Sequence, residues 1–146
     1  MKIFTRLQRF LALAILIAAA APAHAQATPE SLAEEVLMAY EKGDVAKFGE
    51  LVTASPLLDK SATLSAQINT NVRTLLDVYG PVEGWELIKS KSASDRFREN
   101  SYIIFQREFA TRLTLSFYKR STGWITTSFN IDDSASKLLV EQDWPS

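Results

Sequence analysis

The residues of this chain that could do chemistry are acids and tyrosines, because imidazole and thiol groups are almost absent. Among 146 residues there is no Cys and a single His, His24. A Ser-His-Asp or Cys-His nucleophile needs an imidazole or a thiol, and zinc sites of the usual kinds need His or Cys ligands. If His24 is removed with the N-terminal segment described below, the remaining chain can build none of these sites. We therefore expect no transition-metal site and no cofactor.

Two adjacent acids, Asp132 and Asp133, stand at the end of the last expected strand. Carboxylate oxygens bind hard cations such as Ca²⁺, which makes this pair a candidate cation site. Asp is also a preferred N-cap residue, and the sequence from Ser134 through Leu139 fits a short last helix. We favour the helix cap and predict no metal site.

Aromatic side chains supply the second group of candidates. A buried Tyr hydroxyl needs a hydrogen-bond partner, so a tyrosine between helices and a sheet can mark the wall of an apolar pocket. The alternative for each residue is plain core filling. We predict that five aromatic residues line a ligand pocket between helices and sheet: Tyr40, Tyr79, Trp85, Tyr102 and Phe117.

The N-terminal segment has the pattern of a secretory signal peptide. Residues 1–9 are basic, residues 10–21 are continuously apolar, and Ala23 and Ala25 provide small residues two apart. This apolar run is shorter than the about 20 residues that a membrane-spanning helix needs. We expect cleavage after Ala25, a periplasmic or secreted location, and no stable membrane anchor afterwards.

The mature chain, residues 26–146, is expected to form a single domain with a net charge of −4. Residues 82–120 carry a local charge of +3, which suits an anionic ligand or an acidic partner. The alternative, which we favour, is charge that protects sheet edges and loops, because acids are interspersed among the bases. An exported acidic chain is not expected to bind nucleic acid.

Three helices are expected first. Thr28 and Pro29 fit an N-cap and first helical position, and Gly43 fits a helix stop. Asp44 then fits the cap of a second, shorter helix. The third helix shows the clearest apolar stripe before Gly80-Pro81 ends it: Leu64, Ile68, Val72, Leu75, Leu76 and Tyr79.

After Pro81 the hydrophobic period changes to two, which predicts strands. They are expected near residues 85–89, 101–109, 112–119 and 124–131, with a polar loop at 90–98 and a turn at 121–123. Strands joined by short turns are antiparallel. Helices followed by strands indicate the α+β class.

The strand pattern separates two faces of the sheet. We predict that the apolar side packs beneath the third helix, against Ile68, Val72 and Leu75; its members are Leu113, Leu115 and Phe117. The other face then carries Thr114, Ser116, Tyr118, Trp124, Thr126 and Ser128. Aromatic residues are enriched in interfaces, so we predict a homodimer that pairs through this face, with Thr114, Tyr118 and Trp124 in contact. A solvated face is the alternative.

Several short segments resemble the NTF2-like superfamily, the cystatin-like α+β cone. They are Glu41-Lys42-Gly43-Asp44, Tyr79-Gly80-Pro81-Val82, Phe117-Tyr118-Lys119 and Gly123-Trp124, followed by Phe129 and Asp132-Asp133. The resemblance covers residues 31–139 and is to small exported bacterial members without assigned activity. It implies three N-terminal helices packed on a curved antiparallel sheet of about four strands.

That superfamily contains ketosteroid isomerases, dehydratases and polyketide cyclases, and also nonenzymatic binding and dimerisation modules. Its dehydratases rely on His, which the mature chain lacks. Its isomerases use an Asp base with Tyr and a protonated acid, and no acid here matches that motif. Fold analogy alone does not assign a reaction.

Two functions therefore remain open. The first is a nonenzymatic binding or interaction module that holds a small hydrophobic or anionic ligand between helices and sheet. The second is a small lyase or isomerase that acts through Tyr and a buried Asp or Glu. A buried carboxylate within hydrogen-bond reach of a Tyr in one pocket favours the enzyme, whereas a filled core favours the module. We favour the module.

Overall fold

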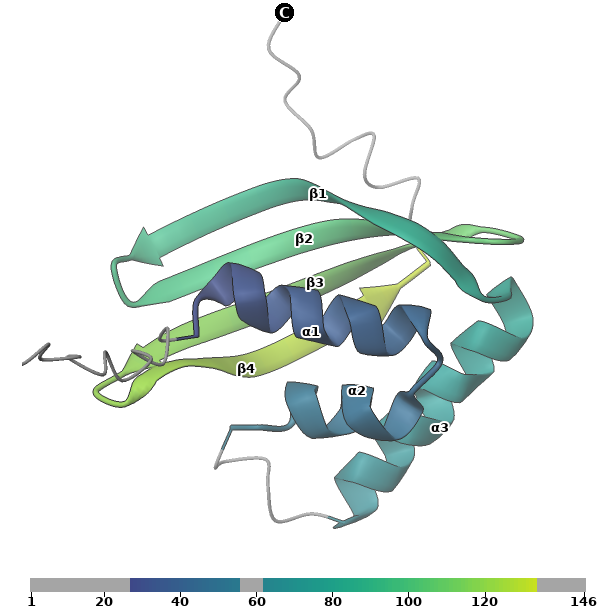
Figure 1. The fold of residues 1–146 in the computed structure, drawn as a ribbon, viewed down its shortest axis with the longest axis horizontal. Helices are drawn as coiled ribbons and strands as arrows, with labels where there is room; N and C mark the ends of the chain where they lie inside the picture. Colours follow the sequence, from purple (N-terminus) through teal and green to yellow (C-terminus); the bar gives the residue numbers. More distant parts are fainter. Residues whose placement is uncertain (1–26, 56–61, 134–146) are drawn as a thin grey trace, which may run out of the picture.

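A computed structural model of the chain describes residues 27–55 and 62–133. Within them three helices precede a four-stranded, open antiparallel sheet (Figure 1), which confirms the predicted α+β class. The expected signal peptide and the expected short helix through Leu139 lie outside the described residues. The elements are α1 (Pro29–Glu41), α2 (Val45–Val52), α3 (Ala62–Tyr79), β1 (Val82–Ser94), β2 (Phe97–Gln106), β3 (Ala110–Arg120) and β4 (Gly123–Asp132), and the strands lie in the order β1-β2-β3-β4.

The first two helices begin where the capping residues predict. Thr28 and Ser31 form a capping box, in which each side chain bonds the backbone N–H of the other. The Asp44 carboxylate accepts from the backbone N–H of Lys47 at 3.0 Å. Gly43 between the helices has a φ of 66°, which lets the chain turn within one residue.

The helix that covers the centre of the sheet is α1, and this corrects the expectation for the third helix. Figure 1 shows α1 across one face of the sheet, with α2 beside it and α3 at the side of α2. α1 contacts β1 and β4, and α2 contacts β4 and both other helices. The buried residues of α1 form one core with the apolar side of β3, whose three residues are fully buried as predicted: Leu113, Leu115 and Phe117.

The first two strands are longer than expected, because residues 90–98 are not a loop. β1 continues to Ser94, a turn occupies Asp95 and Arg96, and β2 begins at Phe97. Residues 91–97 are exposed. Alternation of apolar and polar residues marks a strand only where one face is buried, so this end of the hairpin carries no such signal.

A bulge in the β3–β4 ladder changes which residues of β4 face the helices. Ser116 pairs with Ser128, but Phe117 pairs with Thr126, so one residue of β4 is extra. Directly opposed residues share a face, and Thr126 is accordingly 2% exposed beside the core. Trp124 lies on the same side and packs against the core. The prediction that Trp124 and Thr126 point away from the helices is therefore wrong.

Candidate functional site

A cavity of about 230 Å³ lies between α3 and the end of β4. α3 contributes Ile68, Val72 and Leu75, which recur along one side of the helix, and Phe129 and Ile131 come from the helix-facing side of β4. Two asparagines complete the lining, Asn71 and Asn130. The volume is below the about 300 to 1,000 Å³ of drug-sized ligand sites, so the cavity suits a small molecule or a few apolar side chains.

The chemistry of this cavity is apolar with amide groups at its border. None of its lining residues carries a charge. Its floor is fixed, because the Phe129 ring meets the buried Phe48 ring edge-on with centroids 5.7 Å apart. The Asn130 amide donates a hydrogen bond to Asp132 at 3.1 Å. Such a lining can select shape and hydrophobicity, and it provides no acid or base.

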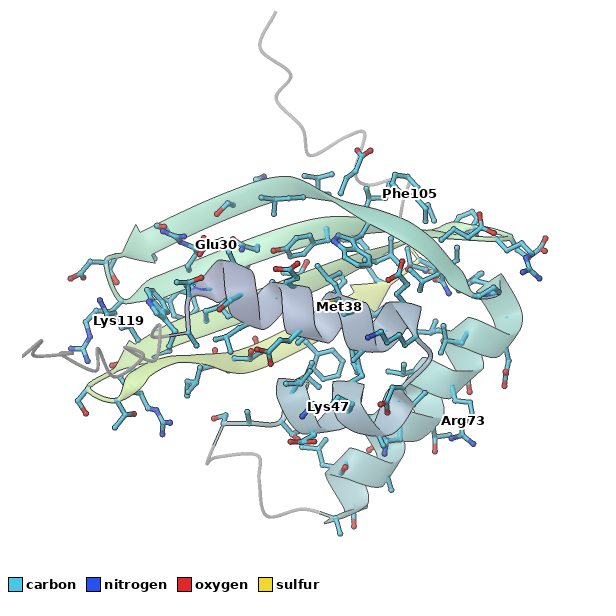
Figure 2. The ribbon with its side chains drawn as sticks, in the orientation of Figure 1. Glu30, Met38, Lys47, Arg73, Phe105 and Lys119 are labelled. Carbon is cyan, nitrogen blue, oxygen red and sulfur yellow. The ribbon has the colours of Figure 1, made fainter. Side chains whose placement is uncertain are left out.

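A second hollow, of about 380 Å³, follows another face of α3 and is lined by residues of that helix: Ala66, Asn69, Thr70, Arg73, Thr74 and Asp77. Arg73 can be followed in Figure 2. The hydroxyls of Thr70 and Thr74 donate back to carbonyls of the helix at 2.9 Å. This polar, single-helix surface builds no enclosed site.

Tyr40, one of the five predicted pocket residues, is in the core and only 1% exposed. Its ring packs on Phe48 with centroids 5.4 Å apart. Its hydroxyl is buried and has no hydrogen-bond partner. The polar side chains near it, Thr111 and Gln106, bond to each other at 3.0 Å. Burial raises the pKa of Tyr40 to about 12, and these two neighbours oppose that rise.

Tyr102 is also buried, and its hydroxyl is satisfied. The amide of Asn100 donates to it at 3.2 Å, and the Ser90 hydroxyl donates to the same amide at 2.8 Å. Burial raises the pKa of Tyr102, the bond from Asn100 lowers it, and the negative charge of Glu30 raises it. Glu30 lies at the start of α1 (Figure 2) and forms an ion pair with Arg98 of β2.

The other three predicted pocket residues lie apart. Phe117 is fully buried in the core, and Trp85 is half-buried on β1 opposite Ile104. Tyr79 ends α3, where its ring packs on Phe109 at 5.6 Å between centroids. Its hydroxyl donates to Asp133 at 3.1 Å, and this hydrogen bond raises the pKa of Tyr79.

The five residues are thus distributed over core and surface, and none of them lines the α3–β4 cavity. Ligand binding by any one of them stays a prediction. The cavity residues themselves could be recognised in part from sequence, since Ile68, Val72 and Leu75 belong to the predicted apolar stripe of the third helix. No local signal in the sequence places that stripe beside Phe129 and Ile131.

The acids of the described residues are all at or near the surface. None of their carboxylates belongs to a buried residue; Glu99 and Asp132 are intermediate and the rest are exposed. Asp132 receives two hydrogen bonds from the Arg112 guanidinium, at 2.9 and 3.2 Å. The Asp133 carboxylate accepts a hydrogen bond from the Tyr79 hydroxyl at 3.1 Å. Within residues 27–55 and 62–133, no group of three acids or other metal ligands converges.

The face of the sheet away from the helices carries two of the three predicted interface residues. The hydroxyls of Thr114 and Ser101 lie 3.1 Å apart across β3 and β2. Tyr118 is 38% exposed and lies between Phe97 of β2 and Ile125 of β4. These three residues form an apolar row at one end of this face, which takes the place that Trp124 was expected to have.

No helix in the part of the chain that the structure describes is long and apolar enough to cross a membrane. No family model matches the chain, and neither does any curated protein compared with it.

Solved structures do resemble it. A candidate NTF2-like transpeptidase from Campylobacter jejuni superposes with a TM-score of 0.54 at 13% identity, covering 69% of this chain and 98% of that one. A candidate calcium/calmodulin-dependent protein kinase type II association domain from Thiobacillus denitrificans gives 0.51 at 12% identity over 71% and 93%. A domain of unknown function with a cystatin-like fold from Nostoc punctiforme gives 0.50 at 11% identity over 75% and 78%. At these identities the likeness concerns the fold, and the chain has the NTF2-like, cystatin-like α+β fold.

Proposed function

We propose that this chain is an exported, nonenzymatic binding module that holds a small apolar molecule in the cavity between α3 and β4. The observation that carries this proposal is the lining of the cavity, which is apolar, uncharged and anchored on a rigid aromatic floor. The uncharged lining favours a hydrophobic ligand over an anionic one. The amide of Asn71 at its border suits a single polar group on that ligand.

The alternative, a lyase or isomerase, has less support. It needs a buried carboxylate within reach of a Tyr in one pocket, and none of the described carboxylates belongs to a buried residue. Tyr79 and Asp133 do form a hydrogen bond, but Asp133 is exposed and the pair does not line the cavity. The raised pKa of Tyr79 also makes its phenol a weaker acid, which is the wrong direction for proton donation near neutrality.

Ligand binding is tested with small neutral probes, indole and n-hexanol, added to the isotope-labelled protein while amide NMR shifts are followed. We expect saturable shifts at α3 and β4. Leu75→Phe narrows the cavity from a half-buried position and should abolish saturation. Val78→Phe, on the same helix but 59% exposed, is the matched control and should bind like the unchanged protein. Shifts that never saturate, or equal binding by both variants, would contradict the proposal.

Export is part of the proposal, and it rests on the basic, apolar and A-x-A pattern of residues 1–25. Intact-mass measurement of protein recovered from a bacterial periplasm should give a chain that begins at Gln26. A mass that still includes residues 1–25 would instead indicate a tethered or unexported protein.

We also propose a homodimer formed through the outer face of the sheet. The row of Phe97, Tyr118 and Ile125 supports it, since a row of apolar and aromatic side chains on a sheet face suits association. Sedimentation at micromolar concentration should show a dimer that Tyr118→Glu dissociates and Val78→Glu does not. A monomer would exclude the dimer, and a dimer indifferent to Tyr118→Glu would place its interface elsewhere.

A further inference from the structure

Basic side chains gather at one end of the sheet, where the β1–β2 and β3–β4 hairpins turn (Figure 1). The backbone N–H of Lys119 donates to the carbonyl of Arg96 at 2.8 Å, so the two hairpins lie side by side there. Residues 91–98 and 118–124 together carry five basic side chains and one acidic side chain. Four of the five bases are called the basic end below: Lys91, Arg96, Lys119 and Arg120.

The charges of the basic end are not neutralised by neighbouring acids. The fifth base, Arg98, forms an ion pair with Glu30 of α1. The four members of the basic end are exposed, and none forms an ion pair with an acid within residues 27–55 and 62–133.

Two of these cations are supported by aromatic rings. The Arg96 guanidinium lies 5.5 Å from the ring centroid of Tyr118, and the Lys119 ammonium lies 6.0 Å from that of Trp124. Such cation–π contacts position the side chains without cancelling their charge. The basic end therefore presents ordered positive charge to a partner.

The acids that alternate with these bases along the chain are largely separated from them in space. Asp95 and Glu99 stay near the basic end, but the other three acids of residues 82–120 lie toward the opposite end of the sheet: Glu83, Glu86 and Glu108. A ten-residue strand such as β2 spans about 33 Å, several times the screening length of about 8 Å at physiological ionic strength. A charged surface at the basic end therefore interacts with its cations and scarcely with the distant acids. The interspersed acids, which favoured a protective role for this charge in the sequence, thus carry less weight.

We propose that the basic end docks the protein reversibly on the surface of a membrane rich in anionic phospholipids. Its cations are spread over two hairpins, and none of them lines either cavity described above, so they suit an extended anionic surface better than one enclosed anion. The rings beneath them, Tyr118 and Trp124, are of the two types enriched at the headgroup level of membranes. This partner is additional to the proposed function and does not depend on the α3–β4 cavity.

Vesicle co-sedimentation tests the docking with soluble protein recovered from a bacterial periplasm. We expect binding to vesicles that contain phosphatidylglycerol, little binding to pure phosphatidylcholine vesicles, and release by high salt. Lys119→Gln/Arg120→Gln should weaken binding to the anionic vesicles about thirtyfold, because each cation near such a surface contributes about fivefold in affinity. The matched control Lys47→Gln/Arg73→Gln makes the same change of net charge on α2 and α3, away from the basic end (Figure 2). It should bind within about twofold of the unchanged protein, since distant charges are screened.

Several outcomes would overturn the proposal. Equal binding to both kinds of vesicle would exclude recognition of anionic lipid, and equal losses in the two double variants would mean that net charge alone decides the binding. Binding to soluble polyglutamate without binding to vesicles would indicate an acidic polymer as the partner. Displacement from vesicles by glycerol phosphate at constant ionic strength would indicate a site for a free anion.

The same two double variants separate membrane docking from the other proposals. Lys119 and Arg120 lie outside the row proposed for the dimer, so both variants should sediment like the unchanged protein when vesicles are absent. Vesicle binding that is lost only together with the dimer would contradict direct docking by the basic end. The indole and hexanol titrations contain no lipid, so their result is independent of this one.

Discussion

The buried hydroxyl of Tyr40 gives a prediction in which one small change should stabilise the protein. The hydroxyl has no hydrogen-bond partner and its residue is 1% exposed. A buried polar group without a partner costs about 1 to 3 kcal/mol. Tyr40→Phe removes that cost and leaves the packing on Phe48 in place. We expect the free energy of unfolding at neutral pH to rise by about 1 kcal/mol.

Tyr102→Phe is the matched control, because it makes the same chemical change at a buried tyrosine whose hydroxyl is bonded. It leaves the amide of Asn100 without one acceptor, so we expect a loss of about 1 kcal/mol. Urea unfolding measures the free energy of unfolding of both variants, provided that its slope with urea concentration is the same in each. A loss for Tyr40→Phe as large as that for Tyr102→Phe would show that the Tyr40 hydroxyl has a partner in solution, and the reasoning from its burial would fail.

The pH dependence of stability tests the same residue a second time. Burial raises the pKa of Tyr40 to about 12, whereas a tyrosine in the unfolded chain has a pKa near 10. A raised pKa stabilises the folded state fully below about pH 10, and this contribution is lost as the pH rises toward about 12. Between neutral pH and pH 11, the free energy of unfolding of the unchanged protein should therefore fall by about 1.4 kcal/mol more than that of Tyr40→Phe. Parallel alkaline profiles for the two proteins would contradict a raised pKa at this site.

Four further substitutions test the packing and one ion pair by urea unfolding. Leu115→Ala should cost about 2 to 5 kcal/mol because the side chain is fully buried, and Thr114→Ala on the other face should cost less than about 1 kcal/mol; equal costs would mean that the faces are assigned wrongly. Gly49→Ala would place its Cβ 2.4 Å from Oδ1 of Asn69, the end of a side chain that can move aside; because Ala is also favoured over Gly inside a helix, it should change stability by less than about 1 kcal/mol, and it should be more stabilising in an Asn69→Ala background. Arg98→Gln breaks an exposed ion pair with α1 and should change stability by less than about 1 kcal/mol, an effect that high salt removes.

Helix starts could be predicted from the sequence because their causes are local. Thr28 and Asp44 each bond a backbone N–H three residues ahead, so a few neighbouring residues determine the outcome. The same holds for the turn that precedes β4 at Gly123. The order of three helices and four strands follows from signals of this kind, and it is the part of the sequence analysis that the structure confirms.

The faces of β4 could not be predicted, since they depend on one inserted residue. Strict alternation puts Trp124 and Thr126 on the face opposite Phe129. The bulge beside Phe117 reverses that assignment for every residue of β4 before it. Its position follows from how two strands pair across the sheet, and the alternating pattern of either strand alone carries no trace of it. The pairing of Phe97 and Tyr118, which replaces Trp124 in the outer row, is equally a property of the register.

The position of the cavity could not be predicted for a related reason. Two helices have an apolar face, and the sequence does not show which of them packs on the centre of the sheet. The apolar stripe of α3 is the clearest in the sequence, and by that pattern either α1 or α3 could cover Leu115. α1 covers the sheet through Val36 and Tyr40 and reaches both outer strands, so the stripe of α3 meets the sheet at the end of β4. There Leu75 remains half-buried beside a cavity. Because α3 lies at the edge of the sheet, its apolar side chains are not fully covered by the rest of the described domain. This is why we expect the cavity between α3 and β4 to bind an apolar group.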